Sequence, residues 1–135
     1  MEKRLMIEKK GYWQLVVRDH FSAAHALRHY QGKCESMHGH NFGVEICVRG
    51  ENLSEPVQYL VDFSILKKEL KKALSLVDHA CLNELPEFRE LNPSSENLAR
   101  FLFQRLQPEI IKLGINLVSV SVSESEKQSA TYFEQ

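Results

Sequence analysis

The chain has 135 residues, of which 17 are lysine or arginine and 18 are aspartate or glutamate. This length suits one ordinary domain with a single core, so we expect residues 1–135 to form one domain. The formal net charge of −1 argues against a nucleic-acid-binding protein, because such domains carry a basic excess or a clustered basic face. Hydrophobic residues make up 43% of the chain and charged residues 26%, which excludes extensive disorder.

Hydropathy and cysteine usage bear on the cellular compartment. No apolar stretch approaches the roughly 18 residues that a membrane-spanning helix needs, and the first ten residues lack the apolar core of a signal peptide. The three cysteines are an odd number without CxxC spacing, which argues against a disulfide framework. We therefore expect a cytoplasmic protein that binds neither membranes nor nucleic acids.

Two segments in the first part of the chain have the pattern of β-strands. Residues 13–27 are rich in strand-forming side chains, and residues 40–49 alternate apolar with polar ones, as a half-buried strand does. A polar stretch that contains Gly32 separates them. Together the two segments predict a β-hairpin with a long connection.

The periodicity becomes helical after residue 63. Residues 64–77 carry one apolar stripe, with Ser64 as a candidate N-cap. A second helix is predicted to begin at residues 92–94, where a proline and a capping serine suit a helix start, and to be interrupted at Pro108. Residues 117–133 alternate again and predict two more strands.

The predicted elements follow one another as strand, strand, helix, helix, strand, strand. No repeat, low-complexity segment or linker divides this series. Strands that pair as neighbours and helices that follow each other indicate an α+β fold. We therefore predict a four-stranded antiparallel sheet with both helices on one of its faces.

His25, His38 and His40 are the strongest candidates for a metal site. His38 and His40 start a strand two residues apart, so their side chains share one face, with Cα atoms about 6–7 Å apart. His25 ends the preceding strand on the parity of its apolar residues. Antiparallel pairing would bring three imidazoles to one end of the hairpin, and three nitrogens with an open fourth position are typical of catalytic Zn²⁺. The alternative is a His-Gly-His turn with incidental histidines.

Cys34 stands in the polar connection, four residues before His38. The neighbouring Lys33 and a nearby dication would favour its thiolate form, which is the reactive one. The spacing alone leaves three roles open for Cys34. It could be a fourth zinc ligand, a catalytic base or nucleophile, or an inert loop cysteine.

Three further residues late in the chain are candidates for the same chemistry. Asp78 and His79 follow directly on the first predicted helix, and a carboxylate beside an imidazole can orient it for proton transfer. The alternative is a helix C-terminus with a favourable cation. Glu124 shares the strand parity of the apolar residues before it. A carboxylate on such a face either pairs internally or binds a ligand that offers several N–H donors.

These residues and their flanking segments resemble the 6-pyruvoyl-tetrahydropterin synthase and 6-carboxy-tetrahydropterin synthase family. The spacing Cys34-x3-His38-Gly-His40 is similar to that of the bacterial 6-carboxy-tetrahydropterin synthases of queuosine biosynthesis. Two mild departures are Ser125 and a serine cap at the second helix, where the family commonly has threonine. The matching segments come in family order and cover nearly the whole chain after residue 12: residues 21–25, 33–42, 61–63, 78–83, 92–97 and 120–124.

The resemblance implies a tunnelling fold, in which sheets of neighbouring chains assemble into a barrel, usually as a homohexamer of two trimers. It implies a zinc-dependent lyase that converts 7,8-dihydroneopterin triphosphate to 6-carboxy-5,6,7,8-tetrahydropterin, acetaldehyde and triphosphate. Cys34 would then be a catalytic thiolate beside the zinc histidines of its own chain. The pair Asp78 and His79 would come from a neighbouring chain, and His79, oriented by Asp78, would return or relay protons. Glu124 would bind the amino-pyrimidine edge of the pterin.

Several alternatives stay open at this point. Arg28 and Lys33 are candidates for triphosphate contacts, and solvated loop charges account for them equally well. Within the family, 6-pyruvoyl-tetrahydropterin formation would use the same scaffold, as would an aldolase-like cleavage of dihydroneopterin. Variants with the aldolase activity tend to carry glutamate where Cys34 stands. A non-catalytic zinc- or pterin-binding protein is the rival of a different class, and it would need neither Cys34 nor Glu124.

Overall fold

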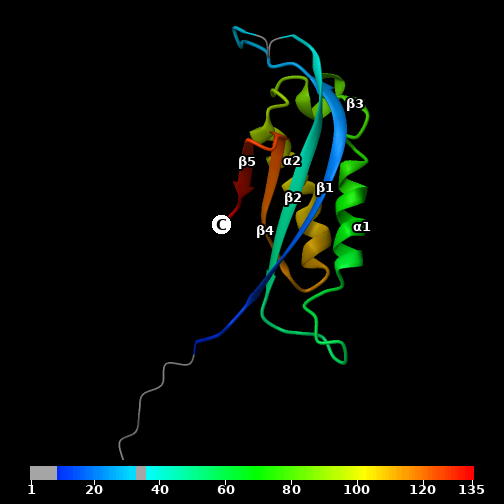
Figure 1. Cartoon of the computed structure of the whole chain (residues 1–135), viewed down its shortest axis with the longest axis vertical. Coiled ribbons are helices and arrows are strands. Elements are labelled where there is room, and N and C mark those ends of the chain that lie inside the picture. The colour runs from blue at the N-terminus through cyan, green and yellow to red at the C-terminus, as the bar shows by residue number, and fades with distance from the viewer. Residues whose placement is uncertain (1–8, 33–35) are drawn as a thin grey trace, which may run out of the picture.

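The computed structural model describes residues 9–32 and 36–135, and Figure 1 shows the arrangement of their elements. A long hairpin comes first, followed by the first helix, a very short strand, the second helix and a second hairpin. Two short 3₁₀ helices, Leu82–Glu84 and Pro86–Phe88, precede the second α-helix. The main elements are β1 (Trp13–His25), β2 (His38–Gly50), α1 (Phe63–Leu74), β3 (Ala80–Cys81), α2 (Ser95–Ile111), β4 (Asn116–Ser125) and β5 (Gln128–Phe133).

The sheet has the strand order β3-β1-β2-β4-β5. The four long strands pair antiparallel, as predicted, whereas β3 runs parallel to β1. The predicted four-stranded antiparallel sheet is therefore corrected to a mixed sheet of five strands within the described residues. Residues Ala80 and Cys81 escape sequence-based prediction because a two-residue strand cannot show an alternation.

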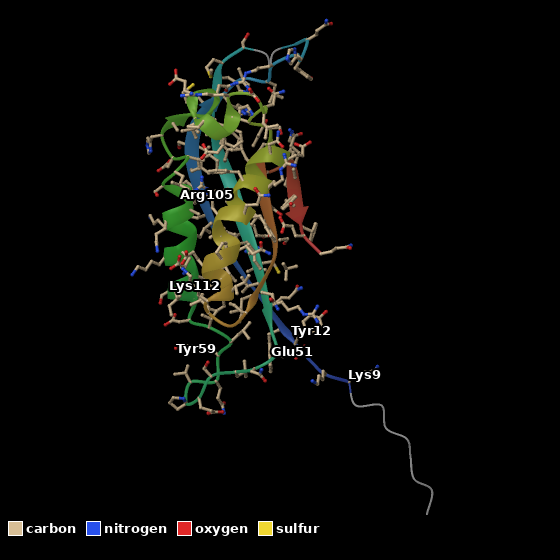
Figure 2. All side chains as sticks on the ribbon, turned by 180° about the vertical axis from the view of Figure 1, so that it is seen from behind. Lys9, Tyr12, Glu51, Tyr59, Arg105 and Lys112 are labelled. Carbon is tan, nitrogen blue, oxygen red and sulfur yellow. The ribbon has the colours of Figure 1, made fainter. Side chains whose placement is uncertain are left out.

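Both helices cover the same face of the sheet, which confirms the predicted α+β class (Figure 1). Figure 2 shows α1 and α2 side by side from the opposite direction. Helix α1 is capped by Asp62, whose carboxylate accepts a hydrogen bond from Ser64 N at 2.8 Å, so Ser64 is not the cap. Helix α2 begins after Ser94 as predicted and continues through Pro108 to Ile111. The missing N–H of Pro108 is tolerated because buried Ile110 keeps this last turn packed on the core.

The core lies between the helices and the covered face of the sheet. Phe21 and Phe42 are opposite each other on β1 and β2, and their rings stack with centroids 4.8 Å apart. Burying each ring contributes roughly 1.5–3 kcal/mol to stability. The Phe42 ring also contacts the rings of His25 and His40, with centroid distances of 5.2 and 5.5 Å. His25 and His40 thus pack against the buried ring of Phe42.

The opposite face of the sheet has no helix on it among the described residues (Figure 1). It is polar, with an Arg18–Glu45 ion pair of 2.7 Å. Both sheet edges are largely free in this single chain, because β3 pairs only with Ala23 and Ala24 of β1 and β5 ends the other side. Neither α1 nor α2, the α-helices of the described chain, is long and apolar enough to cross a bilayer.

Candidate metal centre and active site

The hairpin register places the three histidines at one end of the β1–β2 pair. His25 is directly opposite His38, and His40 is opposite Ala23. Because β-strand side chains alternate, the same register puts all three imidazoles on the covered face. The side chain of His25 is 1% exposed, whereas those of His38 and His40 are partly buried. The three imidazoles therefore converge at this end of the hairpin, as predicted.

The three imidazoles are close enough to share one ion. Their ring centroids are 4.7 Å apart for His25 and His38, 5.3 Å for His25 and His40, and 4.7 Å for His38 and His40. One nitrogen of each ring lies within 4.8 Å of the corresponding nitrogen of the others. Small side-chain rotations bring such nitrogens to the ~2.0–2.1 Å bonds of a zinc ion. Within the described residues, His25, His38 and His40 are the side chains that lie close enough together to hold a metal ion.

Backbone carbonyls fix the orientation of two of these rings. His25 Nδ1 is 2.7 Å from the carbonyl oxygen of Pro93, and His38 Nδ1 is 2.6 Å from that of Ser36. A carbonyl only accepts, so each Nδ1 must carry the proton and each Nε2 keeps a free lone pair. Metal-binding histidines have this arrangement, because the second nitrogen sets the tautomer. Neither carbonyl could be found from the sequence, since backbone oxygens carry no residue signature.

The remaining nitrogens pass a simple test of fit to a cation. Across residues 9–32 and 36–135, the buried side-chain nitrogens or oxygens without a hydrogen-bond partner are His25 Nε2 and His40 Nε2. Leaving buried polar atoms unpaired costs about 1–3 kcal/mol each. Burial lowers the pKa of His25 below its ordinary value, with smaller contributions from the neighbouring His38 and His40. A neutral imidazole at physiological pH is the form that binds metal.

Glu124 lies directly beside this cluster. Its carboxylate oxygens are 3.6 Å from His25 Nε2 and 3.6 Å from His40 Nε2. Strand β4 pairs with β2 so that Ser123 is opposite Gly43, which places Glu124 on the same face as the histidines. The sequence predicted a partner or a ligand for Glu124 but not its place next to the three histidines. Strand parity indicates that Glu124 lies on the apolar face, but only the pairing of β4 with β2 shows that it lies beside His25 and His40.

A hollow of about 460 Å³ opens next to Glu124. Its other walls are Ser94, Ser95 and Glu96 at the start of α2, Leu27, and residues 128–131 of β5. Glu124 therefore joins the histidine cluster to a polar hollow of ligand size.

Asp78 and His79 form a pair of their own at the outer side of β1. Asp78 Oδ1 accepts a hydrogen bond from Ser22 N at 3.0 Å, and Asp78 Oδ2 lies 3.1 Å from His79 Nδ1. The Ser22 N–H, with a smaller contribution from His79, holds the pKa of Asp78 below its ordinary value. The carboxylate is therefore charged at neutral pH and can orient the imidazole. The side chains of Asp78 and His79 thus contact each other, as predicted.

His79 has an unusual backbone conformation for a residue other than glycine. Its φ is 58°, and its N–H donates to Ser22 O at 2.6 Å. Such conformations cost free energy and are concentrated at functional sites. The ring is 82% exposed. Among the described residues, no hydrogen bond or ion pair joins Asp78 or His79 to the three histidines.

Two predicted site residues, Cys34 and Lys33, lie outside the described residues, so the structure does not place them. Arg28 is placed, and its guanidinium donates to the backbone carbonyls of Leu91, Asn83 and Phe88 at 3.1, 3.3 and 2.6 Å. These N–H groups are therefore already used in holding the fold together. The suggestion that Arg28 contacts a triphosphate is therefore not supported.

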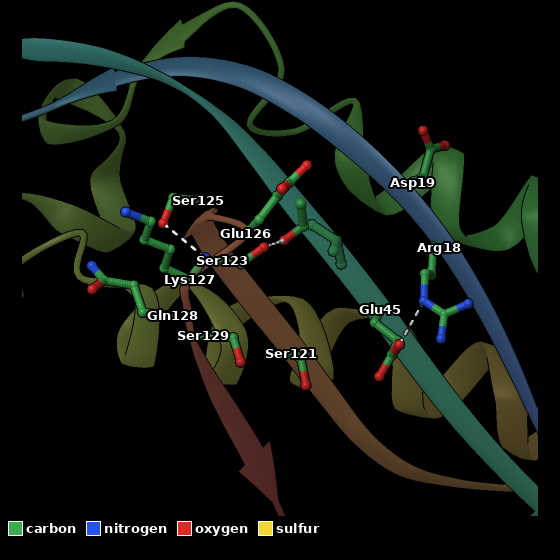
Figure 3. Close-up of a pocket in the computed structure, with 12 residues that line it drawn as sticks. Arg18, Asp19, Glu45, Ser121, Ser123, Ser125, Glu126, Lys127, Gln128 and Ser129 are labelled. Carbon is green, nitrogen blue, oxygen red and sulfur yellow. Dashed lines mark hydrogen bonds and ion pairs between the residues drawn. The ribbon is translucent and has the colours of Figure 1, made fainter.

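A second hollow of about 420 Å³ lies on the uncovered face of the sheet, and Figure 3 shows its lining. Serines of β4 and the Arg18–Glu45 pair form much of it. None of the predicted site residues lines it. The candidate site is therefore identified by the histidine cluster and not by this hollow.

Comparison with known proteins agrees with this geometry. Residues 14–135 match the sequence model of the family described as 6-pyruvoyl tetrahydropterin synthase. The chain belongs to the 6-pyruvoyl tetrahydropterin synthase family. The resemblance seen in the sequence is thereby confirmed, and so is the prediction that the chain is an enzyme, since its relatives bear enzyme names.

Relatives within the family carry different activities in their names. The chain is 32% identical over 125 residues to the 6-carboxy-5,6,7,8-tetrahydropterin synthase of Synechocystis sp., covering 90% of this chain and 93% of the relative. It is 29% identical over 130 residues to the 6-pyruvoyl tetrahydrobiopterin synthase of Dictyostelium discoideum, covering 87% and 93%. The solved structure of 6-pyruvoyl tetrahydropterin synthase from Caenorhabditis elegans superposes with a TM-score of 0.82 at 29% identity, covering 96% of this chain and 100% of that one.

Proposed function

We propose that this family member is a zinc-dependent carbon–carbon lyase of queuosine biosynthesis. It would convert 7,8-dihydroneopterin triphosphate and water to 6-carboxy-5,6,7,8-tetrahydropterin, acetaldehyde and triphosphate. The observation that carries this proposal is the cluster of His25, His38 and His40, with two unpaired buried nitrogens and Glu124 beside them. Relatives named 6-carboxy-5,6,7,8-tetrahydropterin synthase in Synechocystis sp. and Bacillus subtilis support the choice of reaction.

The chain's own residues supply the metal site. His25, His38 and His40 would hold Zn²⁺ through Nε2, because the Nδ1 atoms of His25 and His38 bind backbone carbonyls. Bound zinc polarises oxygen ligands and lowers their pKa, which would activate the hydroxyls of the substrate side chain. The buried position of His25 keeps water away from one side of the site. With three histidine ligands, a coordination position stays open for substrate.

Glu124 is proposed to bind the pterin ring. The amino-pyrimidine edge of a pterin offers adjacent N–H donors, and a carboxylate accepts two of them in a charge-assisted pair. The hollow between Glu124 and the start of α2 has room for the ring. A ring in that position would direct the side chain at its C6 toward the histidines.

Replacing Glu124 by glutamine should raise KM for the pterin substrate about 10- to 100-fold. The amide loses the charge of the acceptor and offers one oxygen instead of two, and a hydrogen bond to a charged group contributes about 1.5–3 kcal/mol. Steady-state kinetics together with zinc analysis would measure this effect. A variant that keeps the wild-type KM but loses zinc would show that Glu124 is a metal ligand instead of the pterin anchor.

Cys34, Asp78 and His79 are proposed to move protons. Cys34 as a thiolate would take a proton from the substrate side chain, and His79, held by Asp78, would donate a proton of its own back to the substrate. Within the described residues, no hydrogen bond or ion pair joins the Asp78–His79 pair to the three histidines of its own chain. We therefore propose that it completes the site of a neighbouring copy.

The open sheet suits such an assembly. The free edges of β1 and β5 can pair between copies, and a head-to-tail contact of this kind closes into a ring. We propose a homohexamer of two trimers in which each site draws residues from two chains. We further propose that residues 1–135 form one domain and that the enzyme works in the cytoplasm.

Identifying the product separates this function from its alternatives. The purified protein is incubated with 7,8-dihydroneopterin triphosphate, and the pterin product is analysed by mass spectrometry. We expect 6-carboxy-tetrahydropterin and acetaldehyde as the products. A 6-pyruvoyl product would assign the activity named for the Dictyostelium relative, and a shortened pterin would assign aldolase chemistry, as in the relative named dihydroneopterin monophosphate aldolase of Pyrococcus furiosus. No turnover at all would favour a binding protein.

A further inference from the structure

The segment that follows β1 is held by side chains where a strand partner would otherwise be. Asn83 pairs with both backbone groups of Ala26, its Oδ1 accepting from Ala26 N and its Nδ2 donating to Ala26 O, each at 2.9 Å. Asn92 does the same two residues later, accepting from Arg28 N at 2.8 Å and donating to Arg28 O at 3.0 Å. Since β3 stops at Cys81, the two amides extend its edge beyond the last backbone pair.

Residues 83–92 and the segment after β1 hold each other: Asn83 and Asn92 bind the backbone of Ala26 and Arg28, and the Arg28 side chain binds the backbone of residues 83–91. The Arg28 guanidinium donates to three backbone carbonyls of residues 83–91. The backbone carbonyl of Asn92 accepts from Asn97 Nδ2 at 2.8 Å, and Asn97 N in turn donates to Ser94 Oγ at 3.1 Å. Asn92 is thus fixed through its side chain on one side and through its carbonyl on the other.

Asn92 is followed directly by the residue that orients a metal ligand. Pro93 O accepts the hydrogen bond from His25 Nδ1 at 2.7 Å. The ring of Pro93 fixes its own φ, and the residues on either side of it, Asn92 and the α2 N-cap Ser94, are both held by hydrogen bonds, so the direction of the Pro93 carbonyl depends in part on where Asn92 is held. Asn92 itself lines none of the hollows beside the metal cluster in the described chain. Its influence on the site must therefore pass through Pro93.

We propose that Asn92 is a positioning residue of the metal centre, which holds the Pro93 carbonyl against Nδ1 of His25 and so keeps His25 Nε2 free for the metal. This inference rests on the proposed metal site. It gives a role to the Asn-Pro-Ser segment beyond the capping of α2. The two links are the Asn92–Arg28 backbone pairing and the Pro93–His25 hydrogen bond.

Zinc affinity of the full-length chain tests the proposal. It is measured by competition with a chromophoric chelator in the wild type, in Asn92→Ala and in Asn83→Ala. Loss of a partner of a metal-binding histidine typically costs 10- to 100-fold in affinity, and we expect this range for Asn92→Ala. Asn83→Ala removes a matched pair of hydrogen bonds at Ala26, but Asn83 does not adjoin Pro93. We expect less than about a 3-fold change there.

The tautomer of His25 in metal-free protein gives a second readout, from long-range ¹⁵N–¹H NMR at pH 8. Wild type and Asn83→Ala should show protonated Nδ1, and Asn92→Ala a mixture of tautomers. If Asn92→Ala does not fold, Asn92→Asp, which keeps only the acceptor for Arg28 N, should show a smaller change in the same direction. Wild-type affinity and tautomer in a folded Asn92 variant would overturn the proposal, as would equal losses in both alanine variants. Failure of the wild type to bind zinc would refute the metal site, while the tautomer would still decide the role of Asn92.

Discussion

Alanine in place of His40 should abolish stoichiometric zinc binding and reduce product formation by at least about 1,000-fold. His40 provides one of three clustered imidazoles, and its Nε2 is buried without a hydrogen-bond partner in the described structure. Loss of Lewis-acid stabilisation worth several kcal/mol corresponds to a rate loss of this size. Metal analysis of the purified variant and a product assay measure the two effects.

His20→Ala is the matched control for that experiment. His20 lies on β1 of the same sheet, but its side chain is 78% exposed, and its ion-pair partner is Asp19, 3.8 Å away. This variant should keep its zinc and its turnover. If His40→Ala retained one zinc per chain, the ion would have to be held elsewhere and the three-histidine site would be wrong.

Replacing Cys34 by alanine should lower the turnover number about 100- to 10,000-fold while zinc content and oligomeric state stay unchanged. The reason is the proposed role of its thiolate as the base that takes a proton from the substrate side chain, since positioned acids and bases contribute this range. The measurement combines single-turnover kinetics with metal analysis and size-exclusion chromatography. A reduced zinc content would assign Cys34 to the metal instead.

Cys47→Ala serves as the control for Cys34→Ala. Cys47 is a partly buried cysteine in the middle of β2. Burial raises the pKa of its thiol, with a smaller contribution from Glu45, so Cys47 stays protonated and inert. The control should therefore leave turnover at the wild-type level. Equal losses in both variants would indicate a general sensitivity of the fold to cysteine replacement.

Strand periodicity was enough to predict from the sequence that His25, His38 and His40 lie together. His25 shares the parity of Phe21, and His40 that of Phe42, so antiparallel pairing of the two strands had to bring the imidazoles together. The N-cap of α2 was predictable for a similar reason, because Ser94 precedes a long apolar stripe. Local rules of this kind hold when both the period and the partner strand are unambiguous.

Other features depend on contacts that are distant in the sequence. The position of Glu124 beside His25 required the pairing of β4 with β2, which no periodicity specifies. The short strand β3 is held by β1 and not by its own two residues. Arg28 looked like a free loop cation, yet three carbonyls of a segment some 60 residues away bind its guanidinium. Each of these depends on tertiary contacts that local patterns do not encode.

Removal and return of the metal tests whether His25, His38 and His40 hold the ion that the reaction needs. Zinc is removed from the wild-type enzyme with a chelator, and 6-carboxy-tetrahydropterin formation is followed as zinc is added back. We predict that activity disappears with the metal and returns in proportion to it, reaching its maximum at one zinc ion per chain. Full product formation by metal-free protein would contradict it, because His25, His38 and His40 would then have no part in the reaction.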